Sequence, residues 1–161
     1  MTYYERNLPH WHPEGRAIFL TWRLHGSLPK EFVRQLAKFT GDPGKQFFKA
    51  ESMLDGATSG PRWLSEPRIV GYVEDAIQRS SELGHCVLHA YVIMANHVHV
   101  LLEPKASLRR ITGGIKGVSA REANRLLGRW GSHSGRKSRS IIGFAMTGNL
   151  SEFELTSRKI P

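Results

Sequence analysis

The stretch "HCVLHAYVIMANHVHVLLEP", residues 85–104, limits the possible folds more than any other part of the chain. Two apolar runs rich in Val, Ile and Leu flank the short pair Ala95-Asn96, a composition typical of two strands joined by a turn. The pattern predicts a β-hairpin over residues 85–103. A hairpin is antiparallel, and it needs further strands or helices against its apolar face to be stable.

The other elements are predicted from side-chain periodicity and from helix-breaking residues. Residues 17–25, "AIFLTWRLH", are rich in β-forming side chains and predict another strand. Apolar residues at helical spacing predict helices at about 27–39, 45–54, 65–77 and 108–128. The order strand, helices, strand-turn-strand, helix predicts an α+β fold, in which helices pack against one side of an antiparallel sheet.

Charge and cysteine content narrow the classes of function. The 161 residues suit one domain, and no apolar run approaches the ~20 residues that a membrane-spanning helix needs. The opening "MTYYERNLPHWHP" lacks the apolar core of a signal peptide, which favours a cytoplasmic protein. The single cysteine, Cys86, excludes an internal disulfide and a Cys-rich zinc site. The net charge of +9 is typical of proteins that bind nucleic acid, although a basic but unspecialised surface has the same composition.

His97 and His99 stand one residue apart in the second strand of the predicted hairpin. Because side chains alternate along a strand, both imidazoles point to one face, while Val98, Val100 and Leu102 point to the other. Two neighbouring neutral imidazoles can bind one divalent ion, and a third ligand must then come from elsewhere. The alternative is that both belong to an ordinary polar face of the strand.

The predicted helix at 108–128 is basic along one side. Arg121, Arg125 and Arg129 are four residues apart and share one helical face, and Lys116 precedes them. These four side chains are candidates for contacts with the phosphates of a nucleic acid, which give affinity without sequence information. A solvated outer face of the helix explains the same pattern equally well.

Several separated segments resemble one family of proteins. "MANHVHVLL", preceded by "LHAYVI", is similar to the core signature of the HUH single-strand DNA nucleases, and above all of the REP-associated tyrosine transposases. These are relatives of the insertion-sequence single-tyrosine transposases. The segments "YERNLPHW", "FLTWRLHGSLP", "SGPRWL" and "GIKGVSAREANRLLGR" resemble the same family in the same order, so the resemblance covers about residues 3–131. One departure is Ala95, where the family usually has proline.

The resemblance implies a fold and a mechanism. The fold is a ferredoxin-like domain that is often dimeric, and its partner is single-stranded or hairpin DNA. His97 and His99 would bind Mg²⁺ or Mn²⁺, which polarises the scissile phosphate. A tyrosine on a C-terminal helix would attack phosphorus and form a 5′-phosphotyrosine. An amide side chain four positions after that tyrosine would supply the third metal ligand.

The C-terminal part of the chain departs from this family. The four tyrosines are Tyr3, Tyr4, Tyr72 and Tyr91, so none follows the hairpin and the expected nucleophile is absent. The tail "GSHSGRKSRSIIGFAMTGNLSEFELTSRKIP" has little helical periodicity. Synonymous codons for "SHSGRKSRSIIGFAM" can be chosen so that a shifted frame spells "PFWQEESFDHWVRD", similar to the family's continuation. We therefore predict a frameshift near Gly131 or Ser132.

These observations divide the chain and leave three functional hypotheses. Residues 1–131 are predicted to form the HUH transposase-like domain, and residues 132–161 an atypical, poorly ordered tail. The first hypothesis is a transposase-family protein deficient in cleavage, and the second is a DNA-binding remnant without catalysis. The third is a metal-dependent hydrolase unrelated to DNA, which is disfavoured because no carboxylate stands out in the sequence as its base.

Overall fold

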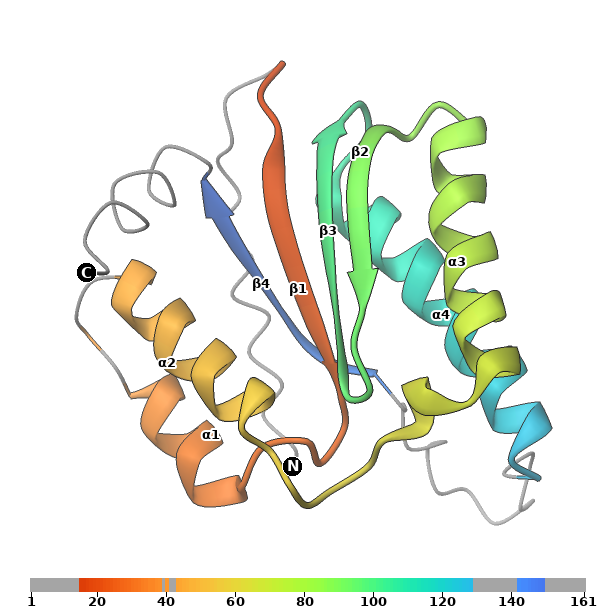
Figure 1. Ribbon diagram of the computed structural model, residues 1–161. Helices are drawn as coiled ribbons and strands as arrows, with labels where there is room; N and C mark the ends of the chain where they lie inside the picture. The colour runs from red at the N-terminus through yellow and green to blue at the C-terminus, as the bar shows by residue number, and fades with distance from the viewer. Residues whose placement is uncertain (1–14, 39, 41–42, 129–141, 150–161) are drawn as a thin grey trace, which may run out of the picture.

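A computed structural model describes residues 15–38, 40, 43–128 and 142–149, and Figure 1 shows their arrangement. The order of elements alternates strands with groups of helices, as the sequence predicts. In chain order they are β1 (Ile18–Leu24), α1 (Lys30–Ala37), α2 (Pro43–Asp55), the short 3₁₀ helix η1 (Trp63–Ser65), α3 (Pro67–Glu82), β2 (Cys86–Ile93), β3 (His97–Pro104), α4 (Leu108–Leu126) and β4 (Ile142–Asn149).

The four strands form one antiparallel sheet in the order β2-β3-β1-β4. A strand, a helical connection, a hairpin, a second helix and a final strand beside the first make up the β-α-β-β-α-β pattern of ferredoxin-like folds. The predicted α+β class and antiparallel sheet are confirmed. Hairpin strands β2 and β3 begin and end within one residue of the predicted bounds.

One face of the sheet carries the main core. Side chains alternate along β1, so Leu20, Trp22 and Leu24 are almost fully buried on this face. Val98, Val100 and Leu102 of β3 join them, as do the apolar stripes of α3 and α4. Figure 1 shows α3 and α4 side by side, with α4 passing behind the hairpin and α3 beside it.

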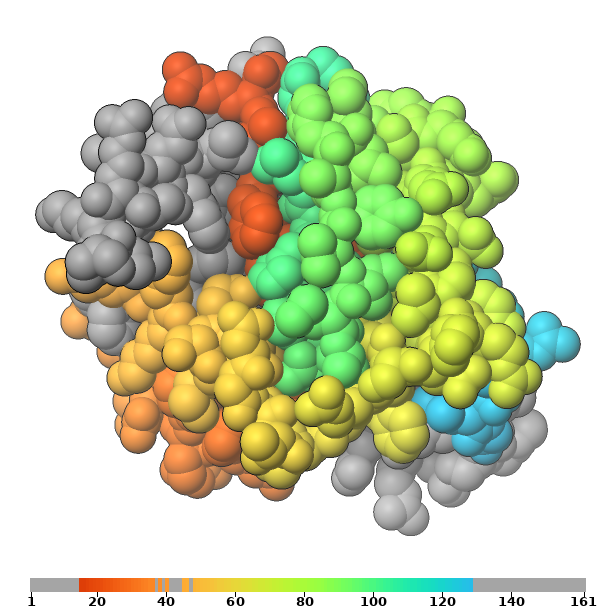
Figure 2. Space-filling model, in the orientation of Figure 1, coloured from red at the N-terminus to blue at the C-terminus, as the bar shows by residue number. Residues whose placement is uncertain are grey.

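The prediction that helices lie on only one side of the sheet was wrong for the helical pair α1–α2, which lies on the side opposite α3 and α4 (Figure 1). This pair follows β1 directly, and side-chain periodicity does not show which side of the sheet it covers. The pair has a small apolar cluster of its own, formed by Leu28, Phe32, Ala50 and Leu54. Its attachment to the sheet includes polar contacts with the turn between β2 and β3. Figure 2 shows residues of β1, in red, at the surface between α2 and the hairpin.

The turn of the hairpin is fixed by bonds from two other segments. The carbonyl of Asn96 accepts from the backbone N–H of Leu24 at 2.8 Å and from the Ser27 hydroxyl at 3.2 Å. The carbonyl of Ala95 accepts from the N–H of Leu64 at 3.2 Å. Since β3 begins at His97, these bonds hold the start of the histidine-bearing strand in one position.

Helix α4 begins after Ser107, whose hydroxyl accepts the N–H of Arg110 at 3.3 Å as an N-cap. Beyond it, residues 142–149 form β4 and pair with β1, although they belong to the segment predicted as a separate tail. The rest of that tail lies outside the described residues, and the predicted boundary at residue 131 stays a prediction. Among the described helices, none is long and apolar enough to cross a membrane.

Candidate metal centre

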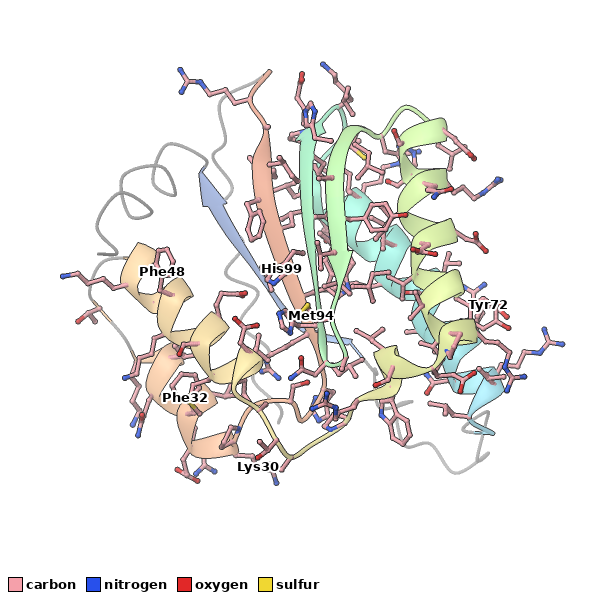
Figure 3. The ribbon with its side chains drawn as sticks, in the orientation of Figure 1. Lys30, Phe32, Phe48, Tyr72, Met94 and His99 are labelled. Atoms are coloured by element: carbon pink, nitrogen blue, oxygen red, sulfur yellow. The ribbon has the colours of Figure 1, made fainter. Side chains whose placement is uncertain are left out.

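His97 and His99 lie together on the face of the sheet that is turned toward α2, where Figure 3 labels His99. Their Nε2 atoms are 2.9 Å apart, and the two rings meet edge to face. His97 is fully buried, and the side chain of His99 is 19% exposed. The predicted shared face is therefore present, with both Nε2 atoms converging on one point.

The neighbouring residue Asn96 sets the proton position on His97. Its amide nitrogen donates to the carbonyl of Leu54 at 2.9 Å, so its Oδ1 must be the atom that faces His97. His97 Nδ1 lies 2.6 Å from that oxygen, which can only accept, so Nδ1 carries the proton. The Nε2 lone pair of His97 is consequently available to a cation.

His99 is held from two sides by β1. Its Nδ1 lies 2.9 Å from the hydroxyl of Thr21, which is its partner in the strand register. Phe19 stacks on the imidazole, with ring centroids 5.2 Å apart and planes inclined by 28°. In the tautomer in which Nδ1 donates to the Thr21 hydroxyl, the Nε2 lone pair of His99 is free, and this is the tautomer that metal binding requires.

Helix α2 brings two carboxylates to this point. Glu51 Oε2 lies 3.2 Å from His99 Nε2 and 4.0 Å from His97 Nε2. Asp55 Oδ1 lies 3.5 Å from His97 Nε2. One ligand atom from each of Glu51, His97 and His99 falls within a 4.8 Å group, which makes this trio a possible metal site.

Sequence reasoning missed both carboxylates. Glu51 and Asp55 are four residues apart in "ESMLD", so they share one face of a helix, and this pattern is a signal that could have found them. No carboxylate stood out in the sequence as a base for the hydrolase hypothesis, but the folded chain brings α2 against the histidine strand and places both carboxylates beside the histidines. Spacing alone could not show it, since α2 and β3 are far apart in the sequence.

Burial shifts the proton affinity of all three groups. The pKa of Glu51 is raised from 4.5 to about 7, mainly by burial and also by the nearby Asp55, against the opposing effect of a hydrogen bond with Thr21. Burial lowers the pKa of His99 from 6.5 to about 4, helped by His97 and opposed by Asp55. The pKa of His97 is also lowered by burial, against an opposing effect of Asp55. Both imidazoles are thus neutral near pH 7, as metal ligands must be.

The donor set fits a divalent ion. Two imidazoles with available Nε2 atoms and a carboxylate are ligands that first-row divalent metals accept. Glu51 Oε1 is also buried without a hydrogen-bond partner among the described residues. A buried acceptor without a donor is costly, and a bound cation would relieve that cost.

We expect the stability of the metal-free protein to reveal the shifted carboxyl of Glu51. The folded state binds the Glu51 proton more tightly than the unfolded state, so its contribution is complete below pH 4.5 and is lost as pH rises through about 7. Glu51→Gln removes the ionisable group that causes this loss of stability. In chelator, the stability of the variant relative to wild type should rise from pH 4.5 to 7 and then level off. Urea unfolding at a series of pH values measures the free energy of unfolding of both proteins. Glu82→Gln on α3 is the control. A flat difference for Glu51→Gln contradicts the prediction.

The predicted DNA-contacting residues lie elsewhere. Arg121 and Arg125 are on the exposed face of α4, and Lys116 is half-buried on the same helix. Arg129 lies outside the described residues. Because α4 packs on the core face, the side chains of Lys116, Arg121 and Arg125 lie across the sheet from the two histidines, and the structure does not bring these described residues to the histidine site.

The described tyrosines are also away from the histidines. Tyr91 is paired in register with Val100 and therefore points to the core face, where Gln78 Nε2 donates to its hydroxyl at 3.4 Å. Tyr72 lies on the outer side of α3, far from the labelled His99 in Figure 3. Within the described part of the chain, no tyrosine is placed to attack a phosphate at the histidine pair.

The fold and the paired histidines beside a buried carboxylate define a class of protein: a small ferredoxin-like α+β domain with a candidate metal site. The model of the family "Transposase IS200 like" matches residues 62–134, a segment that includes the whole hairpin and α4. The resemblance is thereby confirmed at the level of the IS200-type transposase superfamily. The finer likeness to REP-associated members stays a prediction.

The comparisons with whole protein chains are less informative than the family match. A solved structure of a candidate transposase from Deinococcus radiodurans R1 is similar to this chain at 16% identity over 92% of each chain, with a TM-score of 0.44. That degree of likeness by itself decides neither fold nor function. No curated protein matches the sequence.

Proposed function

We propose that this chain is a DNA-binding protein of the IS200-type transposase class. It engages single-stranded or hairpin DNA in the cytoplasm, beside a divalent ion, Mg²⁺ or Mn²⁺, held by His97 and His99. The observation that carries the proposal is the convergence of the two Nε2 atoms, 2.9 Å apart, inside the segment that matches the family. A homodimer is part of the proposal, and light scattering of the purified protein tests it.

The chain's own residues prepare this site. Asn96 and Thr21 bond the Nδ1 atoms, which turns both Nε2 lone pairs toward the same point. The closed packing of His97 excludes water from one side. When bound, the ion would supply polarisation of a phosphate oxygen and stabilise the charge that develops on it.

We assign affinity for DNA to Lys116, Arg121 and Arg125 of α4, and to Arg129, which follows this helix in the sequence. Lys116, Arg121 and Arg125 lie across the sheet from the histidines, so a bound strand must be long enough to reach around the domain. We expect the double substitution Arg121→Ala/Arg125→Ala to weaken hairpin binding similarly for all sequences. The slope of log affinity against log salt should also fall by about one for each DNA phosphate that the variant no longer neutralises.

Fluorescence anisotropy with labelled hairpin DNA at several salt concentrations measures this slope. Arg34→Ala is the matched control, because Arg34 lies on α1 and pairs with Glu31. An unchanged slope in the double variant would remove α4 from the proposed DNA surface. Absence of any salt-dependent DNA binding by wild type would contradict the proposed function itself.

We also propose that the chain is deficient in cleavage, because a frameshift has replaced the nucleophile. The shifted reading frame that yields "PFWQEESFDHWVRD" can also be applied to the residues that follow, up to residue 161. Read two bases later, synonymous codons for "LTSRKIP", residues 155–161, can spell Tyr-Ile-Glu-Glu-Asn-Pro. An amide residue then stands four positions after a tyrosine, which is the arrangement that the resemblance implies for nucleophile and metal ligand.

A second candidate function is metal-dependent hydrolysis unrelated to DNA. The position of Glu51 and Asp55 beside the histidines favours it, because these carboxylates supply a proton acceptor that the sequence pattern does not reveal. A non-catalytic DNA-binding remnant is the third candidate. Salt-dependent DNA binding separates both DNA-based functions from the hydrolase, and release of product from a generic phosphodiester in Mn²⁺ identifies the hydrolase.

A further inference from the structure

We propose that Glu51 is the third protein ligand of the ion at His97 and His99, and that Asp55 bonds to water on that ion. The ion is a first-row transition metal such as Mn²⁺, Co²⁺ or Zn²⁺ rather than Mg²⁺. This inference rests on the proposed function only in requiring a divalent ion at the two histidines. It places the third ligand on α2, in the connection between β1 and α3, rather than near the C-terminus.

The distances between donor atoms meet a simple geometric condition. Two ligands on one ion, each with a bond of about 2.1 Å, cannot be more than ~4.2 Å apart. The separations are 2.9 Å between the two Nε2 atoms, 3.2 Å from His99 Nε2 to Glu51 Oε2, and 4.0 Å from His97 Nε2 to the same oxygen. All three fall below that limit, so one ion can contact all three atoms without a change of backbone.

Burial distinguishes the two carboxylates. The side chain of Glu51 is 13% exposed, and its Oε1 has no hydrogen-bond partner among the described residues. The side chain of Asp55 is 60% exposed, so water already satisfies its oxygens. Only Glu51 has a buried oxygen without a hydrogen-bond partner among the described residues, which assigns the direct bond to the Glu51 carboxylate and the outer position to Asp55.

The position of the ligands is also fixed by the protein around them. The side chain of Asn96 forms hydrogen bonds with both Leu54 of α2 and His97 of β3. It therefore connects the helix that carries Glu51 to the strand that carries the histidines, within one helical turn of Glu51. Loss of a group that orients metal ligands in this way typically lowers metal affinity by about 10- to 100-fold. The site is therefore built before an ion arrives.

The chemistry of the donors selects the class of ion. Mg²⁺ prefers oxygen ligands and gives up its waters reluctantly, so two imidazoles suit it poorly. Two imidazoles and one carboxylate suit Mn²⁺, Co²⁺ and Zn²⁺, with affinity rising broadly along the transition series from Mn²⁺ to Co²⁺. The expected preference is therefore for any of these ions over Mg²⁺.

The test is titration of the full chain with Co²⁺, followed by its visible absorption, with Mn²⁺ and Mg²⁺ titrated by calorimetry. We expect Glu51→Gln to weaken Co²⁺ binding by at least ~100-fold and Asp55→Asn by ~10-fold or less. Glu82→Gln on α3 is the matched control and should bind as wild type does. Glu51→His should retain Co²⁺ with an altered spectrum, a change that a purely structural role of residue 51 would not produce. Urea unfolding confirms that each variant is folded.

The outcomes separate this inference from the proposed function. If wild type binds Co²⁺ and Glu51→Gln binds it equally well, Glu51 is not a ligand, while the histidine site stands. If wild type binds none of the ions, the metal part of the proposed function fails as well. Mg²⁺ binding as tight as Co²⁺ binding would overturn the assigned class of ion.

Discussion

The proposed frameshift predicts that a chain with the shifted reading frame after Gly131 makes a covalent DNA complex and that the present chain does not. Incubated with labelled hairpin-forming single-stranded DNA and Mn²⁺, the present chain should give no adduct on a denaturing gel. The reframed chain should give a protein–DNA band, because its tyrosine oxygen can attack phosphorus and displace the 3′-oxygen. The phosphodiester bond is exchanged for a phosphotyrosine bond, so no energy source is needed.

Two controls make this result specific. Replacing the restored tyrosine with phenylalanine should abolish the adduct, and His97→Ala in the reframed chain should do so through loss of the ion. The nucleotide sequence after codon 131 provides an independent check, because a shifted frame without the Trp-Gln segment and the downstream tyrosine rules out the frameshift. An adduct formed by the present chain would show that a nucleophile is not missing from it.

Substitution of Asn96 by Ala should destabilise the metal-free protein by about 2–6 kcal/mol. The side chain is nearly fully buried, and it satisfies two buried groups, the carbonyl of Leu54 and the Nδ1–H of His97. Each group left without a partner costs about 1–3 kcal/mol. Urea unfolding in chelator measures the loss, and we expect metal affinity to fall as well because His97 loses its orientation.

Asn124→Ala is the matched control for this substitution. Asn124 is half-buried on α4, and its replacement should change stability by no more than about 0.5 kcal/mol. Asn96→Asp separates the two bonds, because a carboxylate still accepts from His97 but cannot donate to Leu54. Equal stability of Asn96→Ala and Asn124→Ala would show that the two bonds of Asn96 do not hold the site together.

The local part of the site could be predicted from the sequence. Alternation of side chains is a property of a single strand, so "NHVHV" was enough to place His97 and His99 on one face and the valines on the other. The apolar runs on both sides of Ala95-Asn96 likewise predicted the hairpin, and the family match supports the superfamily. Each of these features depends on residues that are close together in the chain.

The basic helix shows the opposite case. Four-residue spacing correctly indicated that Arg121 and Arg125 share an exposed face of α4. It could not indicate which side of the sheet that helix covers, because the side depends on where the apolar stripe of the helix is buried. Packing of Ile111 and Ile115 into the main core puts the arginines on the side away from the histidines.

The sequence by itself determined the antiparallel hairpin, the common face of His97 and His99, and the absence of a tyrosine after Tyr91. The tertiary structure alone decided which groups surround that face. Glu51 reaches His99 only because the α1–α2 pair folds back over the sheet, and Thr21 reaches it only through the pairing of β1 with β3. Such contacts join residues that are distant in sequence, and their free energy arises from packing that no local pattern encodes.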